Sequence, residues 1–188
     1  GIYNWTSSPL LTNCSFSNNS AGEGGGMYNL TTSSPQLTNC SFSNNSAGEG
    51  GGMNNNMMSS PALTNCILWG DSPPGIHNTD STSTPAISYS DIQDGCGADP
   101  YSMCGAGNID ADPLFVDQDN GDFHLGPGSP CIDKGTDDVP DPPGLPTTDF
   151  DGDPRILDGD SDGEPIVDMG ADEALWHPVY LPLVLKGD

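Results

Sequence analysis

The chain has 188 residues, of which 33% are apolar and 7% aromatic, with 25 glycines and 18 prolines. This composition excludes helical bundles and implies many tight turns. Asp and Glu number 27 against three Lys and Arg, a net charge of -24, which excludes nucleic acids and anionic membranes as partners because phosphate binding needs clustered basic residues. No apolar run is long enough to span a bilayer.

The six cysteines, in a chain rich in Ser, Thr and Asn, are typical of a protein from an oxidising compartment. We therefore expect a secreted protein, located outside the cell or at its surface. The excess of carboxylates suits a calcium-rich or saline exterior, because divalent cations and screening reduce self-repulsion. The sequence starts inside a repeat, at Gly1, and is expected to be a processed or trimmed form.

A repeat of 26 residues dominates the first part of the chain. Residues 33–49, SSPQLTNCSFSNNSAGE, match residues 7–23 almost one for one, and a third copy starts at Ser59. Three cysteines, Cys14, Cys40 and Cys66, are consequently spaced by 26 residues. A fixed period of this length indicates a stacked unit that needs neighbours on both sides to bury its apolar face.

The repeated unit predicts strands and turns rather than helices. Cys40 and Phe42 alternate with Ser41 and Ser43, which is the period of a strand, and the unit is poor in helix formers. A lap of 26 residues accommodates three short strands, with the next lap about 4.8 Å above it. We predict an all-β fold, a right-handed parallel β-helix (solenoid) of about five coils with an irregular Asp-rich C-terminal region.

Stacking of equivalent laps places equivalent side chains in columns. Two apolar columns are expected in the interior, Leu11/Leu37/Leu63 and Phe16/Phe42/Leu68. At a bend, a column of asparagines is expected to form amide-to-amide hydrogen bonds: Asn13, Asn39 and Asn65. The glycine runs 24–26 and 50–52 are expected to supply positive φ angles at another corner.

The cysteine column is expected to consist of buried free thiols. Stacked Cβ atoms about 4.8 Å apart exceed the usual disulfide spacing of roughly 3.5 to 4.5 Å, and the repeat has no adjacent histidine for a zinc site. A metal site or a source of disulfides is the alternative. Cys96 and Cys104 differ, because they flank a Gly- and Pro-containing loop that a disulfide between them would close.

The quoted repeat resembles a known family of surface proteins. The pattern Pro-x-Leu-Thr-Asn-Cys-x-Phe-Ser-x-Asn-Ser-Ala, followed by Gly-Gly-Gly-Met-Tyr-Asn, resembles the parallel β-helix repeats of polymorphic outer-membrane-like surface proteins. Later segments look like the last coils of the bacterial choice-of-anchor β-helix domain: 87–92, 108–116, 122–125, 128–135, 149–155 and 167–173. The resemblance implies a surface protein and is specific for fold rather than for activity.

Two parts of the chain are expected. Residues 1–135 are predicted to form the coils, with an insertion loop at about 93–107, and residues 136–188 an Asp/Gly/Pro-rich cap with an apolar tail. The tail is too short to cross a bilayer and is predicted to mediate assembly through Trp176, Val179, Tyr180, Leu181, Leu183 and Leu185. A head-to-tail contact between unlike surfaces would generate a filament of the chain with itself.

Acidic residues in the C-terminal region predict a calcium site. Asp158, Asp160 and Asp162 alternate before Gly163, and Asp168 follows as a closing ligand, although the bidentate glutamate of an EF-hand loop is missing. A solvated Asp/Gly turn is the alternative. The same spacing recurs at Asp149, Asp151 and Asp153, and at Asp117, Asp119 and Asp122.

Catalytic residues are scarce, and we expect no enzyme activity. The basic residues are Lys134, Arg155 and Lys186, too few for a polysaccharide lyase, which sets Arg or Lys against a substrate carboxylate. The three histidines are isolated in sequence. We therefore expect an extracellular structural protein that forms filaments or decorates the cell surface. The alternatives are a glycan-binding or adhesive module and a degenerate polysaccharide-degrading enzyme.

Overall fold

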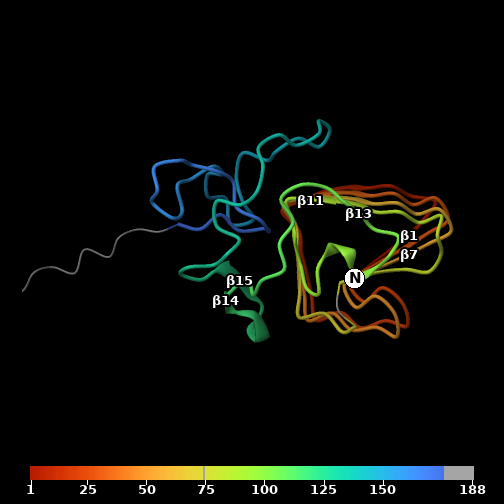
Figure 1. Cartoon of the computed structure of the whole chain (residues 1–188). Helices are drawn as coiled ribbons and strands as arrows, with labels where there is room; N and C mark the ends of the chain where they lie inside the picture. The colour runs from red at the N-terminus through yellow and green to blue at the C-terminus, as the bar shows by residue number, and fades with distance from the viewer. Residues whose placement is uncertain (74, 176–188) are drawn as a thin grey trace, which may run out of the picture.

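The computed structural model describes residues 1–73 and 75–175. Apart from two short 3₁₀ helices, regular structure in these residues consists of β-strands, and three parallel sheets form a solenoid (Figure 1). An irregular region follows in sequence and lies beside the solenoid. Among the described residues, no helix has the length and apolarity required to cross a membrane.

Each lap of the chain contributes one short strand to each sheet. Sheet 1 contains β1 (Ile2–Trp5), β4 (Met27–Leu30), β7 (Met53–Asn56) and β10 (Ile76–Asn78). Sheet 2 contains β2 (Leu10–Thr12), β5 (Gln36–Thr38), β8 (Ala62–Thr64), β11 (Ala86–Ser88) and β13 (Met103–Cys104). Sheet 3 contains β3 (Ser15–Ser17), β6 (Ser41–Ser43), β9 (Ile67–Trp69) and β12 (Asp91–Ile92). The predicted parallel β-solenoid is confirmed, and five strands in one sheet and four in the others come close to the expected coil number.

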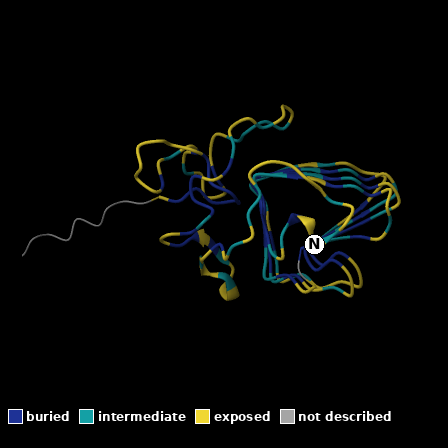
Figure 2. Cartoon of the chain, in the orientation of Figure 1, coloured by how far each residue is buried: buried dark blue, intermediate teal, exposed yellow. Residues whose placement is uncertain are grey.

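The strands pair in the register that the repeat predicts. Leu37 lies between Leu11 and Leu63, and Phe42 lies between Phe16 and Leu68. The rings of Phe16 and Phe42 stack with their centroids 4.5 Å apart. These columns, with buried methionines from sheet 1, form the apolar core, and the exposed residues lie mainly at the corners (Figure 2).

A buried column of amides runs through the interior behind sheet 1. Each asparagine side chain donates to the next lap, from Asn4 to Asn29 at 2.8 Å, from Asn29 to Asn55 at 2.8 Å, and from Asn55 to Asn78 at 2.9 Å. Asn78 donates in turn to Asp99 at 2.9 Å. Buried amides are stable only when hydrogen bonded, so this column both satisfies its members and fixes the register.

Glycines allow the corner before sheet 1 to close tightly. Gly24 and Gly50 have φ angles of 60° and 61°, as the sequence predicts for this corner. Gly26 has a different reason to be glycine, because a Cβ there would lie 2.6 Å from the carbonyl oxygen of Gly52 in the next lap. The corner therefore needs both the left-handed backbone and the absence of side chains.

The fourth lap is shorter, and a disulfide-closed loop follows it. Ala86 pairs with Ala62, 24 residues earlier, instead of the 26 of the first laps. The loop after β12 contains the 3₁₀ helix η1 (Cys96–Ala98), and Cys96 forms the predicted disulfide with Cys104. Asp99 of this loop accepts from both the backbone N–H and the side chain of Asn78, so the loop completes the amide column.

Parallel pairing stops at Ile109, whereas coils were expected up to residue 135. Ile109 forms an isolated parallel bridge with Asp91. Residues 115–125 form an antiparallel hairpin instead, with β14 (Phe115–Asp117), η2 (Gln118–Asn120) and β15 (Asp122–Leu125). Pro113 offers no backbone N–H to a sheet, which disfavours another strand at this point. The irregular region thus begins about 25 residues earlier than the predicted boundary.

The asparagines at the corner between sheets 2 and 3 do not form the predicted continuous column of amide-to-amide hydrogen bonds. Asn13, Asn39 and Asn65 have φ angles of 51° to 54° and lie in a column, but only Asn65 donates to a neighbour in it, at 3.4 Å. Their amides donate instead to backbone carbonyls of the irregular region, those of Thr148, Asp168 and Thr136. The regularly spaced corner is therefore the surface on which residues 110–175 pack.

A further short column ends in an acid where the earlier laps have an amide. Asn19 donates to Asn45, and Asn45 donates to Asp71, both at 2.9 Å. Asp71 is 4% exposed, its Oδ2 has no hydrogen bond, and burial raises the pKa of its carboxyl to about 6. In the lap below, Asn45 Nδ2 also donates to the carbonyl of Phe16.

We predict that Asp71→Asn stabilises the protein at neutral pH. Because the folded state binds the Asp71 proton more tightly than the unfolded state, this group's contribution to stability is present below pH 4 and is lost as the pH rises through about 6. Two units of pKa correspond to about 3 kcal/mol, an upper value for the gain at pH 7.5. Urea unfolding of both proteins at pH 4 and pH 7.5 measures it. An equal difference at both pH values would contradict this explanation.

Candidate cation site and the C-terminal region

The irregular region is held together by carboxylates that accept backbone N–H groups. Asp149 Oδ1 accepts from the amides of residues 151, 152 and 153, each at 2.9 Å, and Oδ2 accepts from Glu173. Asp172 accepts from Leu125 of the hairpin at 2.8 Å. Because these residues form few regular sheets, the carboxylates replace the backbone partners that strands would provide.

Asp168 and Glu173 are the buried centre of this network. Asp168 accepts from the amides of Asp133 and Ala174, both at 2.7 Å. Glu173 accepts from the amides of Ile156 and Leu157 at 2.9 and 2.8 Å. Burial, together with the charge of Glu173, raises the pKa of Asp168 to about 8. Asp168 thus has a structural role.

Of the two described Lys and Arg residues, Arg155 is the one whose side chain is buried. Its guanidinium lies 3.3 Å from the Glu173 carboxylate and donates to the carbonyl of Ala171 at 2.7 Å. It also donates to Asn13 Oδ1 at 3.0 Å, which ties the irregular region to the first lap of the solenoid. Burial lowers the pKa of Arg155, and the surrounding carboxylates oppose that shift.

His124 joins the hairpin to the loop that follows Asp149. Its Nδ1 lies 2.5 Å from Asp122 Oδ1, and its Nε2 lies 2.6 Å from Asp151 Oδ2. Burial lowers the pKa of His124, but the hydrogen bonds to the two carboxylates outweigh that effect and raise it to about 9. Since each ring nitrogen faces a different aspartate, His124 links the hairpin to this loop through two ion pairs.

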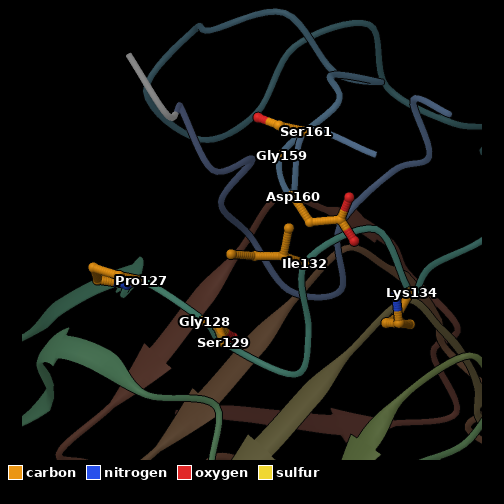
Figure 3. A pocket seen from close by; sticks show the side chains of 8 residues that line it. All are labelled: Pro127, Gly128, Ser129, Ile132, Lys134, Gly159, Asp160 and Ser161. Atoms are coloured by element: carbon orange, nitrogen blue, oxygen red, sulfur yellow. The ribbon is translucent and has the colours of Figure 1, made fainter. Parts of the chain in front are cut away.

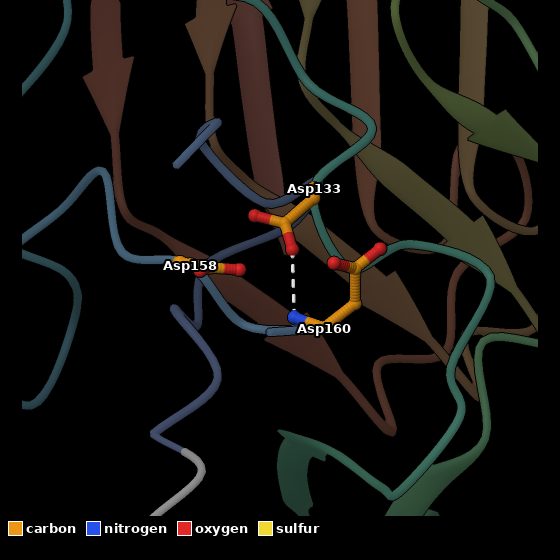
Figure 4. A group of neighbouring side chains, drawn as sticks. All are labelled: Asp133, Asp158 and Asp160. Carbon is orange, nitrogen blue, oxygen red and sulfur yellow. Dashed lines mark hydrogen bonds between the residues drawn. The ribbon is translucent and has the colours of Figure 1, made fainter. Parts of the chain in front are cut away.

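Three carboxylates gather at one place and could hold a metal ion. Asp133, Asp158 and Asp160 each offer an oxygen within 4.8 Å of the others (Figure 4). Asp133 is buried, whereas Asp158 and Asp160 are exposed, and Asp133 also accepts from the backbone amide of Asp160 at 2.8 Å. Hard divalent cations prefer such a set of oxygen ligands.

An open cavity adjoins this triad. It has a volume of about 430 Å³ and shares Asp160 with the triad (Figure 3). Ile132 contributes an apolar wall, and Lys134 also lines the cavity. The site therefore combines carboxylate ligands with an adjoining hollow that has both charged and apolar walls.

The predicted acidic residues lie in different parts of the region. Asp158 and Asp160 belong to the triad, whereas Asp162 does not. The backbone N–H of Asp162 donates to Asp158 and Asp160, and its carboxylate accepts from the amide of Glu164. Asp168 and Asp149 bind backbone amides, Asp151 pairs with His124, and Asp153 is in neither arrangement. Asp133 was not predicted as a ligand, because 25 residues separate it from Asp158 and only the fold brings them together.

The remaining site residues have mixed outcomes. Cys14, Cys40 and Cys66 are free thiols, as expected; Cys40 and Cys66 are buried, whereas Cys14 is half-buried. Burial raises the pKa of Cys40. The assembly tail, residues 176–188, lies outside the described residues, as do His177 and Lys186.

A group of aromatic side chains lies on the outer face of sheet 1. Tyr3 is 59% and Trp5 65% exposed, while Asn4 between them points inward. Tyr28 pairs with Tyr3 and Leu30 pairs with Trp5 in the next lap, and both are partly exposed. We call the set Tyr3, Trp5, Tyr28 and Leu30 the aromatic platform.

We predict that Arg155→Met destabilises the irregular region by about 3 to 5 kcal/mol, the usual cost when one partner of a buried ion pair is removed. The Glu173 carboxylate would remain buried without its cation, and the contact with Asn13 would be lost. Hydrogen exchange of residues 147–175 measures the effect. Lys134→Met, at an exposed position, is the control. Exchange at wild-type rates in Arg155→Met would exclude this role.

Comparison with known proteins agrees with the solenoid. The protein-family model described as a right-handed beta helix region matches residues 1–107, which is the part of the chain that forms the parallel coils. No curated protein and no solved structure matches the chain. The resemblance of the repeat to polymorphic outer-membrane-like proteins and that of the later segments to the choice-of-anchor domain stay predictions. With more than half of its length matched, the chain belongs to the family of proteins with a right-handed β-helix region.

Proposed function

We propose that the chain is an extracellular structural module of the cell surface and that it has no catalytic activity. The observation that carries this proposal is the use of the repeated polar side chains. Those of the amide column donate to the next lap, and those at the corner bind the irregular region. The repeated polar groups therefore hold the laps together and attach the irregular region to them. The disulfide between Cys96 and Cys104 supports an oxidising compartment.

The placement of the basic residues supports a role other than polysaccharide cleavage. A lyase needs a cation in a substrate groove. Of the two described Lys and Arg residues, Arg155 is buried against Glu173, and Lys134 is exposed among aspartates. Neither lies on the outer faces of the three sheets, where an extended sugar chain would bind a β-helix.

Labelling of intact cells tests the proposed location. We expect a membrane-impermeant biotin reagent or an added antibody to reach the protein without lysis. We also expect mass spectrometry under non-reducing conditions to recover the Cys96–Cys104 disulfide from the native source. A cytosolic protein of the same cells is the control. Detection after lysis alone, with both cysteines reduced, would refute the proposal.

Calcium is the cation that we propose for the triad of Asp133, Asp158 and Asp160. Its ligands are carboxylate oxygens, and calcium tolerates the irregular geometry that a loop supplies. Bound there, the ion would link the segment around Asp133 to the loop around Asp158. It would thereby stabilise a region that few strands support.

We predict that calcium raises the unfolding temperature of the protein and that Asp158→Asn with Asp160→Asn abolishes the increase. A ligand at 100 times its Kd adds about 2.7 kcal/mol to the stability of the folded state. Calorimetry with calcium and then with a chelator measures it. Asp137→Asn with Asp138→Asn changes the net charge equally outside the triad and should keep the increase. Equal loss in both double variants would show general screening instead of a site.

Glycan binding is the second candidate, and the aromatic platform favours it. Exposed aromatic rings on a flat sheet offer apolar faces with polar edges, which suit stacking against sugar rings. A module of the cell surface would meet such polymers.

The head-to-tail assembly through residues 176–188 also stays a prediction, with a second copy of the chain as the proposed partner.

A further inference from the structure

We propose that the aromatic platform binds a polysaccharide whose sugar rings carry free amino groups. This inference rests on the glycan-binding function proposed above and names its ligand class. It starts from the position of the platform on the solenoid. In Figure 1 the irregular region lies on the side of the solenoid opposite β1 and β7, so it leaves the outer face of sheet 1 open.

The platform would stay exposed in a longer stack. Coils stack along the solenoid axis, so a lap added next to β1 would pair with its edge and extend the outer face. Alternation along β1 directs Tyr3 and Trp5 outward, and the parallel register repeats this direction in β4. The outward position of the rings therefore follows from the strand register.

The dimensions of the platform suit single sugar rings. Residues two apart on a strand are about 7 Å apart, and neighbouring strands are about 5 Å apart. The rings of Tyr3 and Tyr28 have centroids 5.5 Å apart and are tilted by 57°. Four side chains are far fewer than the 20 or so residues, about 800 Å², that each partner contributes to a stable protein interface. A linear polymer that places one or two rings on the platform fits this small area.

The charge next to the platform selects for a cationic ligand. Glu23 lines the same surface hollow as Tyr3 and Tyr28, and its carboxylate adds to the effect of burial in raising the pKa of Tyr28. Glu49 stacks on Glu23 in the next lap and faces His77 at 3.4 Å, in the same row of sheet 1 as the tyrosines. The two described Lys and Arg residues, Lys134 and Arg155, lie in the irregular region, and His77 is the described basic side chain that contacts this acidic pair. An ammonium group therefore finds carboxylates here, and an acidic sugar is repelled.

The aromatic rings and the carboxylates would recognise different parts of the polysaccharide. The aromatic rings attract the apolar face of a sugar ring, and their negative faces also attract a nearby ammonium group. The carboxylates of Glu23 and Glu49 then pair with amino groups of neighbouring sugars. Glycans without amino groups would keep the stacking and lose the ion pairs.

Titration of the full chain with three soluble hexasaccharides tests the proposal. The probes are β-1,4-linked glucosamine, its fully N-acetylated counterpart and a β-1,4-linked glucose hexamer, followed by calorimetry. We expect the glucosamine hexamer to bind about tenfold more tightly than the other two, with affinity falling as salt increases. Trp5→Ala and Tyr28→Ala should each weaken binding of this hexamer about tenfold. Tyr101→Ala, outside sheet 1, should leave its affinity unchanged.

Charge-matched variants separate a site from general attraction to an acidic protein. Glu23→Gln with Glu49→Gln should remove the preference for the amino sugar, whereas Asp137→Asn with Asp138→Asn should keep it. Equal effects of the two double variants would overturn the proposal. Equal or tighter binding of the N-acetylated or glucose hexamer would also overturn it, while glycan binding itself would stand. If no hexamer bound, both the ligand class and the glycan-binding function would fail. Thermal unfolding of every variant confirms that it is folded.

Discussion

The in-register contact between one lap and the next is the constraint on which the rest of the structure depends. A short strand of three or four residues has too few hydrogen bonds to be stable alone, so each strand needs its equivalents above and below. The buried amides strengthen this requirement, because a slip of one residue would leave every member of the column without a partner. The polar interior therefore fixes the register that the apolar columns stabilise. The same register sets the outward positions of Tyr3, Trp5 and Tyr28 and the regular corner on which the irregular region packs.

The repeat made the solenoid predictable from the sequence, but it did not show how each polar column is used. Leu37 and Phe42 are where the period places them, because apolar alternation and the 26-residue spacing define an inward side chain without knowledge of the partners. Asn39 accepts the predicted amide-to-amide hydrogen bond from Asn65, but its own side-chain amide donates to the carbonyl of Asp168 instead of to the column. An amide at a bend can bind the next lap or an external segment, and the segment that binds it comes 129 residues later. Asn29 and Asn55 recur at the end of the repeated Gly-Gly-Gly-Met-x-Asn segment, but this segment was interpreted as a glycine corner, and no hydrogen-bonded column was predicted from it.

The irregular region was the part least accessible to sequence reasoning. Alternating aspartates predicted a cation loop, and Asp158 and Asp160 do lie in a cluster of carboxylates. The pattern could not distinguish them from Asp149, which accepts from four backbone amides, or Asp168, which is buried. An aspartate before a glycine turn has the same local sequence whether its oxygens face amides, a histidine or an ion. The role of each aspartate depends on a residue from another segment: Asp133 completes the triad, His124 pairs with Asp151, and Glu173 lies near Asp168.

The high negative charge has different consequences in the two parts of the molecule. In the coils, acidic residues are few, and Asp71 shows the cost of placing one in the interior, since its pKa is raised and one oxygen lacks a partner. In the irregular region, carboxylates are buried because each one accepts backbone N–H groups that have no strand to bind. Burial of several such groups around one arginine makes that region dependent on Arg155 and on any cation held by the triad. Because the coils contain fewer acidic residues than the irregular region, we expect ionic conditions to affect the attachment of the C-terminal region more strongly than the coils.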